Sequence, residues 1–202
     1  MTITYEVDTG LYVNVTNKCT NRCEFCIRNN GDGAYGSDSL WLEREPGREE
    51  ILESIFSRDL SGYTEIVFCG YGEPAVRLSD CRAIALAIKE KYPDMKVRIN
   101  TNGHSDLILG MDTAWMYEGA FDTVSISLNT PTAEGYNRLC HPAFGPRSHK
   151  ALLDLARRLS TLVPKVMLSV VKETLTDDEL SECRRLSDTV GAELKVRTYI
   201  GA

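Results

Sequence analysis

The stretch that decides the fold is Cys19-Thr20-Asn21-Arg22-Cys23-Glu24-Phe25-Cys26. It spaces three thiols as C-x-x-x-C-x-x-C, directly after the alternating apolar run at 11–15 that predicts a strand. A strand that leads into a tight loop can bring three sulfurs around one metal centre. Electron-carrying iron–sulfur cubanes normally take four cysteines, and structural zinc sites are closed by four ligands. Three ligands leave a position open, as metal catalysis requires; the alternatives are a chance grouping or half of a zinc site.

Length and composition predict one domain, residues 1–202, with a full hydrophobic core. A hydrophobic content of 43% and a charged content of 26% are ordinary for a globular protein. The net charge is −6 without a basic run, which argues against a nucleic-acid partner because phosphate binding needs Lys and Arg. No apolar stretch has the length of a membrane span, and the first residues lack the pattern of a signal peptide. We therefore expect a cytoplasmic protein whose clustered cysteines bind metal.

Short apolar runs alternate with amphipathic stretches along the chain. The runs predict strands at 11–15, 65–69, 96–100, 123–128, 165–171 and 194–199. The amphipathic stretches predict helices at 46–56, 79–92, 113–118, 151–159 and 176–190. Thr176 and Glu179 give the last helix a capping box, and Gly191 ends it. This alternation predicts an α/β fold with a parallel sheet, whose site lies at the carboxyl ends of the strands.

Glycines and short polar residues follow the predicted strands. Gly70-Tyr71-Gly72-Glu73-Pro74 comes after the second strand, where glycines permit close backbone approach to a ligand and a strand end offers acceptors to an ammonium group. Asn100-Thr101-Asn102-Gly103 ends the third strand, and Ser127 and Asn129 end the fourth. Such residues also terminate strands and form turns without any ligand, which is the alternative reading.

The cysteine spacing, the segment 70–74 and the segment 100–103 together resemble the radical S-adenosylmethionine (radical SAM) superfamily, over the whole chain. The resemblance implies a partial (β/α)6 barrel with a parallel sheet. The small size, the Thr-Asn-Gly segment and Val13-Asn14-Val15-Thr16-Asn17 are most similar to the TatD-associated radical SAM proteins.

The resemblance also implies the chemistry. A [4Fe–4S] cluster on Cys19, Cys23 and Cys26 would chelate S-adenosylmethionine at its open iron. One electron, from a reductant such as flavodoxin or ferredoxin, would cleave S-adenosylmethionine to methionine and a 5′-deoxyadenosyl radical. That radical would abstract hydrogen from a substrate that the sequence does not identify.

By the same resemblance, Gly70, Tyr71, Gly72 and Glu73 match the Gly-Gly-Glu-Pro motif that binds the amino group of S-adenosylmethionine, with Tyr71 in place of a glycine. The other positions that match cofactor contacts are Phe25, Val171 and Arg197 (or Tyr199) for the adenine, Asn100 and Asn102 after the third strand, Ser127 for the ribose and Asn129 for the carboxylate. Related enzymes can hold charged side chains at the last two positions, so neutral Ser127 and Asn129 predict weaker binding.

Two alternative functions stay open. The nearer is an activating enzyme that makes a glycyl radical on a partner protein. The other is a non-catalytic iron–sulfur electron-transfer or zinc-binding protein, which would need a fourth ligand from Cys69 or Cys140. Cys140 and His141 lie in the polar connection 131–146, where a structural role is the simpler interpretation.

The radical site is expected to be poorly covered. Few residues follow the last predicted strand, and 28–45 and 131–146 are the only long connections that could close over the site. A radical must be kept from solvent, so a large substrate, a partner protein or a second copy should complete the wall. We therefore expect a peptide or protein substrate, with Tyr136 and His141 facing it.

Overall fold

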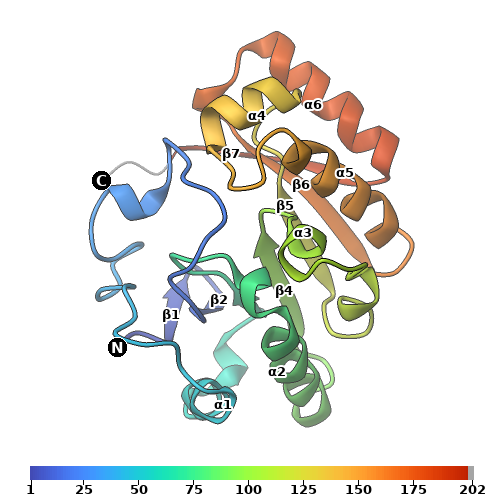
Figure 1. Cartoon of the computed structure of the whole chain (residues 1–202). Helices are drawn as coiled ribbons and strands as arrows, with labels where there is room; N and C mark the ends of the chain where they lie inside the picture. Colours follow the sequence, from blue (N-terminus) through green and yellow to red (C-terminus); the bar gives the residue numbers. More distant parts are fainter. Residues whose placement is uncertain (200–202) are drawn as a thin grey trace.

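The computed structural model describes residues 1–199 (Figure 1). These residues form one seven-stranded sheet flanked by helices. Its strands are β1 (Thr4–Val7), β2 (Gly10–Val13), β3 (Glu65–Phe68), β4 (Lys96–Thr101), β5 (Thr123–Ser127), β6 (Lys165–Val171) and β7 (Glu193–Arg197). Each strand pairs with its neighbours in sequence; β2 to β7 are parallel, and β1 is antiparallel to β2. Parallel strands in sequential order are the arrangement of β/α barrels, so the predicted α/β fold is confirmed.

The helices of the described residues follow the strands in alternation. They are α1 (Arg48–Phe56), α2 (Leu78–Lys91), α3 (Ser105–Leu109), α4 (Ala133–Cys140), α5 (Arg147–Leu159) and α6 (Asp177–Val190). In Figure 1 the long irregular segment between β2 and α1 arches along the side of the molecule away from α2 and α5. That segment carries the three clustered cysteines.

Four short elements differ from the sequence prediction of six strands and five helices. The strand β1 is additional, and the predicted helix at 113–118 is a single 3-10 turn, Ala114–Met116, preceded by α3. The predicted polar connection 131–146 contains α4. Each is only a few residues long, and β1 also depends on its pairing with β2, so periodicity alone does not reveal them. Residues 200–202, placed after the last strand by the sequence, lie outside the described part.

The main core lies between the sheet and the helices, and local signals frame it. In β6 every residue from Val166 to Val171 is buried, as expected for a strand covered on both faces. The last helix begins with the predicted capping box, in which Thr176 Oγ1 accepts from the Glu179 N–H (3.2 Å) and Glu179 Oε2 accepts from the Thr176 N–H (2.9 Å). It ends at Gly191, whose φ is 72°.

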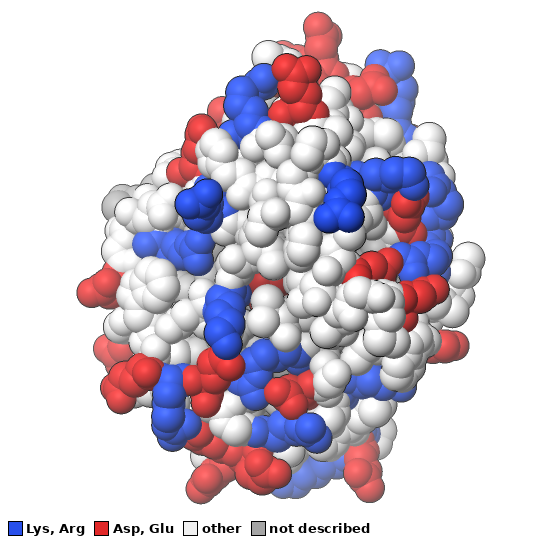
Figure 2. All heavy atoms as spheres, in the orientation of Figure 1, with Lys and Arg blue, Asp and Glu red and all other residues white. Residues whose placement is uncertain are grey.

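The surface carries both signs of charge. On the face shown in Figure 2, Lys and Arg side chains alternate with Asp and Glu side chains around a band of uncharged residues. Some are paired directly, such as Arg44 with Glu50 (2.7 Å) and Lys165 with Glu193 (2.7 Å). Among the helices of residues 1–199, none combines the length and the apolar composition needed to cross a bilayer.

Candidate active site

The cysteine loop, residues 19–26, follows β2 and lies against the C-terminal end of α4. The backbone N–H of Arg22 donates to the Cys140 carbonyl (2.9 Å), and that of Glu24 donates to the Leu139 carbonyl (3.1 Å). The loop and the end of the helix therefore run side by side. The connection expected to form a loose cover instead supports the cysteine loop.

The thiols of Cys19, Cys23 and Cys26 are free and partly buried. Burial raises the pKa of the Cys19 thiol to about 12, and it also raises the pKa of the Cys26 thiol. For Cys23, a hydrogen bond with the Cys140 thiol is the largest cause of a raised pKa, followed by burial. The three thiols are thus protonated at neutral pH in the free protein, and a metal that binds them must displace protons.

The segment Gly70–Glu73 after β3 packs directly on the residues that lead into the cysteine loop. A Cβ atom on Gly72 would lie 2.1 Å from the Thr16 carbonyl oxygen and 2.8 Å from that of Lys18. The N–H of Glu73 donates to the Lys18 carbonyl (2.8 Å). Two backbones this close leave no room for a side chain, so position 72 needs glycine.

The Glu73 carboxylate is buried and joins the ends of β3 and β4. Its Oε1 accepts from the Thr101 hydroxyl (2.6 Å) and the Ala75 N–H (2.9 Å), and its Oε2 accepts from the Asn102 N–H (2.6 Å). Burial outweighs these three hydrogen bonds and raises the pKa of Glu73 to about 7. Glu73 is therefore poised between its neutral and charged forms at physiological pH.

Tyr71, which stands where the family has glycine, has a buried side chain. It is only 3% exposed and packs with Tyr5, Ala34 and Leu40 in a small second core. Its hydroxyl donates to the carbonyl of Gly31 (2.7 Å) or Gly33 (3.0 Å), which both lie in the connection 28–45. The substitution thus anchors that connection and leaves the backbone of the turn unobstructed.

Asn100 and Asn129 are the predicted cofactor residues with unused hydrogen-bonding capacity. Each has a buried side-chain oxygen without a partner among residues 1–199. The amide of Asn100 bonds the sulfur of Cys69, and the Nδ2 of Asn129 donates to the sulfur of Cys140 (3.3 Å). A buried acceptor without a donor is costly, so a donor from a ligand would stabilise either one.

Asn102 and Ser127 differ from each other in how much of their hydrogen-bonding capacity the protein already uses. The Nδ2 of Asn102 donates to the Thr20 hydroxyl (2.8 Å), and its Oδ1 accepts from the His104 N–H (3.1 Å), so this side chain holds the cysteine loop. Ser127 ends β5 opposite Ser169 of β6 and is partly exposed. Of the two, Ser127 is the more accessible to a ligand.

The residues expected at the adenine lie on the cysteine loop, on β6, and on or just after β7. Phe25 is partly buried against the main core, and Val171 is 5% exposed. Arg197 is exposed and lies beside Val171 in the pairing of β6 with β7. Tyr199 is also exposed, and its N–H donates to Glu173 (2.7 Å). The structure therefore places Val171 and Arg197 together and Phe25 on the cysteine loop.

Three residues that support the cysteine loop were not predicted from the sequence to do so. Asn21, His104 and Tyr136 are buried, and the Tyr136 hydroxyl hydrogen-bonds both of the other two. Tyr136, expected to face a substrate, is fully buried, so that expectation is wrong; His141 is exposed, beside Glu24 (3.1 Å). The contacts join residues as much as 115 positions apart, and no local pattern marks them.

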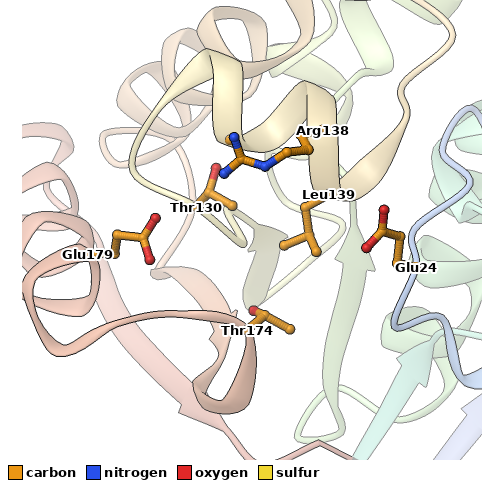
Figure 3. A pocket seen from close by; sticks show the side chains of 7 residues that line it. Glu24, Thr130, Arg138, Leu139, Thr174 and Glu179 are labelled. Atoms are coloured by element: carbon orange, nitrogen blue, oxygen red, sulfur yellow. The ribbon is translucent and has the colours of Figure 1, made fainter.

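A pocket of about 200 Å³ opens next to the cysteine loop, where the chain leaves β5 and β6. Figure 3 shows Glu24 and Glu179 on opposite sides of it, with Arg138 near Thr130. The residues that line it are Glu24, Thr130, Gly135, Arg138, Leu139, Thr174 and Glu179. Both signs of charge and two hydroxyls therefore meet at one edge of the site.

Comparison with known proteins identifies the family. The sequence profile of the radical SAM superfamily matches residues 13–186, and the chain belongs to that superfamily. GTP 3′,8-cyclase of Corynebacterium glutamicum is 32% identical over 132 residues, which are 62% of this chain and 32% of that protein. The chain spans 22% to 32% of the length of the curated relatives that it matches.

Solved structures share the fold. Streptococcus suis SuiB bound to S-adenosylmethionine superposes with a TM-score of 0.68 and 18% identity, covering 94% of this chain and 38% of SuiB. SuiB bound to its precursor peptide SuiA gives a TM-score of 0.69 and 16% identity, covering 98% of this chain and 40% of that chain. At this identity the likeness concerns the fold alone.

The cofactors of the superfamily are a [4Fe–4S] cluster and S-adenosylmethionine, and the residues fit both. In residues 1–199 no three Cys, His, Asp or Glu side chains converge as ligands of a single ion do. A cubane requires a wider arrangement, because each thiolate binds a different iron, and three free thiols on one loop provide that donor set. The unpartnered oxygens of Asn100 and Asn129 suit the amino or hydroxyl groups of S-adenosylmethionine.

Proposed function

We propose that this chain cleaves S-adenosylmethionine reductively and uses the resulting 5′-deoxyadenosyl radical to abstract hydrogen from a substrate. Cys19, Cys23 and Cys26 hold the [4Fe–4S] cluster in this proposal. The bound cluster supplies the electron that breaks the carbon–sulfur bond. Residues 1–202 act as one radical SAM domain, most similar to the TatD-associated subgroup, and we expect it to work in the cytoplasm.

The observation that carries the proposal is the contact between the Gly70–Glu73 turn and residues 16–18, which lead directly into the cysteine loop. The two meet backbone to backbone, through Gly72 against Thr16 and through the N–H of Glu73 to Lys18. A cofactor bound by three thiolates on one side and by strand-end carbonyls on the other needs these two segments side by side. Their packing leaves no space for a side chain at position 72, which fixes their relative position.

The chain's own residues then bind and orient S-adenosylmethionine. Carbonyls of the 70–73 turn would accept from its amino group, the second Nδ2 hydrogen of Asn129 would donate to its carboxylate, and Ser127 would bond the ribose. The oxygen of Asn100, which meets no donor among residues 1–199, would add a further acceptor. Val171 and Phe25 supply apolar surface to the adenine, and Arg197 packs at its edge. Positioning of this kind is the protein's main contribution when the cofactor carries the reactive chemistry.

A peptide or protein is the substrate class that we favour. The pocket beside the cysteine loop presents Glu24, Glu179 and Arg138 together with two threonines, a set that can pair with the charged side chains and amides of a peptide. The fold neighbour SuiB binds a precursor peptide. A glycyl-radical activating enzyme would use the same edge with a protein partner, so it remains the second candidate within this chemistry, and flavodoxin or ferredoxin would supply the electron.

The test is anaerobic reconstitution with iron and sulfide, followed by dithionite and S-adenosylmethionine. Wild-type protein should be brown and should yield 5′-deoxyadenosine and methionine, measured by liquid chromatography and mass spectrometry. Cys19→Ala, Cys23→Ala and Cys26→Ala should each abolish both the cluster and the cleavage. Cys183→Ala, at a buried cysteine of α6, is the matched control and should retain both. A Cys19/Cys23/Cys26 triple variant that still holds a four-iron cluster would refute the proposal.

A further inference from the structure

A hydrogen-bonded chain of side chains, all buried except the partly buried Thr20, runs behind the cysteine loop. It begins at Asn102, whose Nδ2 donates to the Thr20 hydroxyl (2.8 Å), and continues from Thr20 to the Nδ1 of His104 (3.3 Å). The Nε2 of His104 lies 3.2 Å from the hydroxyl of Tyr136, which accepts from the Nδ2 of Asn21 (2.9 Å). This series of hydrogen bonds therefore starts just after β4, includes Tyr136 of α4, and meets the cysteine loop at both Thr20 and Asn21.

Asn21 connects this chain to two of the three clustered sulfurs. Its backbone N–H donates to the sulfur of Cys19 (3.4 Å), and its side-chain amide hydrogen-bonds the sulfur of Cys23. The residue is only 3% exposed, and its Oδ1 has no partner among residues 1–199. One residue thus donates to two sulfurs from a position that water does not reach.

The direction of the Asn21 amide does not depend on the tautomer of His104. Burial lowers the pKa of His104 to about 4, so the ring is neutral and has one donor and one acceptor. In one tautomer Thr20 donates to the ring and the ring donates to Tyr136; in the other both directions reverse. The Tyr136 oxygen has a free lone pair for the Asn21 amide in both cases, so Nδ2 stays directed toward Tyr136 and Cys23.

We infer that Asn21, oriented by Tyr136 and His104, is the hydrogen-bond donor that sets the reduction potential of the cluster. The inference rests on the proposed function, which assigns Cys19 and Cys23 as cluster ligands. Reduction adds negative charge that spreads onto the ligand sulfurs, and hydrogen bonds to those sulfurs stabilise it and raise the potential. Asn21 donates directly to the ligands, while Tyr136 and His104 are positioning residues that act through it.

The experiment measures the reduction potential of the cluster in reconstituted protein by redox titration monitored with electron paramagnetic resonance. Asn21→Leu keeps the shape of the side chain but removes its donors, so the potential should become more negative. Tyr136→Phe deletes one oxygen and should shift the potential in the same direction by a smaller amount. Because Tyr136 acts through Asn21, the Asn21→Leu/Tyr136→Phe double variant should match Asn21→Leu alone.

Tyr117→Phe is the matched control, since Tyr117 is an equally buried tyrosine outside this chain, and it should leave the potential unchanged. The titration measures only the molecules that contain a cluster, so the reduction potential can be determined even if a variant reconstitutes poorly. If Asn21→Leu binds too little cluster to measure, Tyr136→Phe provides the test. Unchanged potentials in both variants, or fully additive shifts in the double variant, would overturn this inference while the wild-type cluster and its cleavage activity stand. A wild type that holds no cluster would overturn the proposed function with it.

Discussion

The helix α6 and the cysteine loop are held in place by opposite means. The ends of helix α6 are fixed by neighbours in sequence: Thr176 and Glu179 cap its start, and Gly191 ends it. The cysteine loop is fixed by residues far along the chain, through bonds that span 82 positions from Asn102 to Thr20 and 115 positions from Asn21 to Tyr136. An element held locally tolerates changes elsewhere, whereas one held by distant backbone and buried polar groups should be sensitive to small changes in any of its partners.

The largest expected effect is a difference in the free energy of unfolding between two glycine-to-alanine variants, one beside the cysteine loop and one at the end of α6. Gly72→Ala places a Cβ against the Thr16 backbone and should lower the free energy of unfolding by about 3 kcal/mol. Gly191→Ala, at the end of α6, meets only the Ser160 side chain at 3.3 Å and should cost about 1 kcal/mol for its positive φ. Urea unfolding of the apoproteins measures both. Equal losses would mean that the contact at Gly72 relaxes easily and that the comparison fails.

The second prediction concerns the buried Glu73. Its pKa is raised from 4.5 to about 7, so between these values the folded protein holds a proton that the unfolded chain has lost. The contribution of Glu73 to the free energy of unfolding therefore falls as pH rises from about 4.5 to about 7, by roughly 3 kcal/mol. Chemical unfolding of the apoprotein across this range should show that Glu73→Gln lacks this decline.

The matched control for Glu73 is Glu50→Gln in α1. Arg44 lowers the pKa of Glu50 at the surface, so this change should leave the decline between pH 4.5 and 7 in place. If Glu73→Gln and wild type instead follow parallel curves over that range, the Glu73 carboxyl is ionised in the folded protein and its three hydrogen bonds outweigh burial.

A smaller effect is expected where the connection 28–45 is anchored. Tyr71→Phe removes the hydroxyl that bonds the carbonyls of Gly31 and Gly33, at a cost of about 1 kcal/mol. Hydrogen exchange should then speed up in 28–45 and remain unchanged in α6. Tyr92→Phe, in a tyrosine whose ring packs on Phe56, is the control and should change neither. Protection of 28–45 that survives Tyr71→Phe would show that the small second core alone holds it.

The smallest effect is predicted for Cys140→Ser. The sulfur of Cys140 contacts Cys23, so it is the thiol best placed to be a fourth ligand. Serine keeps a group that can accept from Asn129, and with three cysteines as the full ligand set the iron content should not change. Iron that falls to the level of Cys23→Ala would show four protein ligands, which would favour the electron-transfer alternative. Cys69→Ser serves as the comparison and should likewise retain iron.

Much of the framework follows from short-range pattern. Runs such as 165–171 and the cap at Thr176 are encoded within a few residues, so periodicity and capping rules locate them. The strand β1 escapes such rules because it depends on its pairing with β2, and the helices α3 and α4 escape them because they are too short to show a helical period. The role of Tyr71 also escaped them, since its bonds to Gly31 and Gly33 join positions about 40 apart.

The sequence by itself determined the family, the parallel α/β sheet and the three thiols in one loop, because these depend on spacing and on residue type at neighbouring positions. Only the tertiary structure decided how that loop is held. The contact of Gly72 with Thr16 and the path from Asn102 to Asn21 through His104 and Tyr136 join strands and helices far apart in sequence. Side-chain direction and burial, which decide whether a polar atom meets a partner or a ligand, are fixed only when those elements pack together.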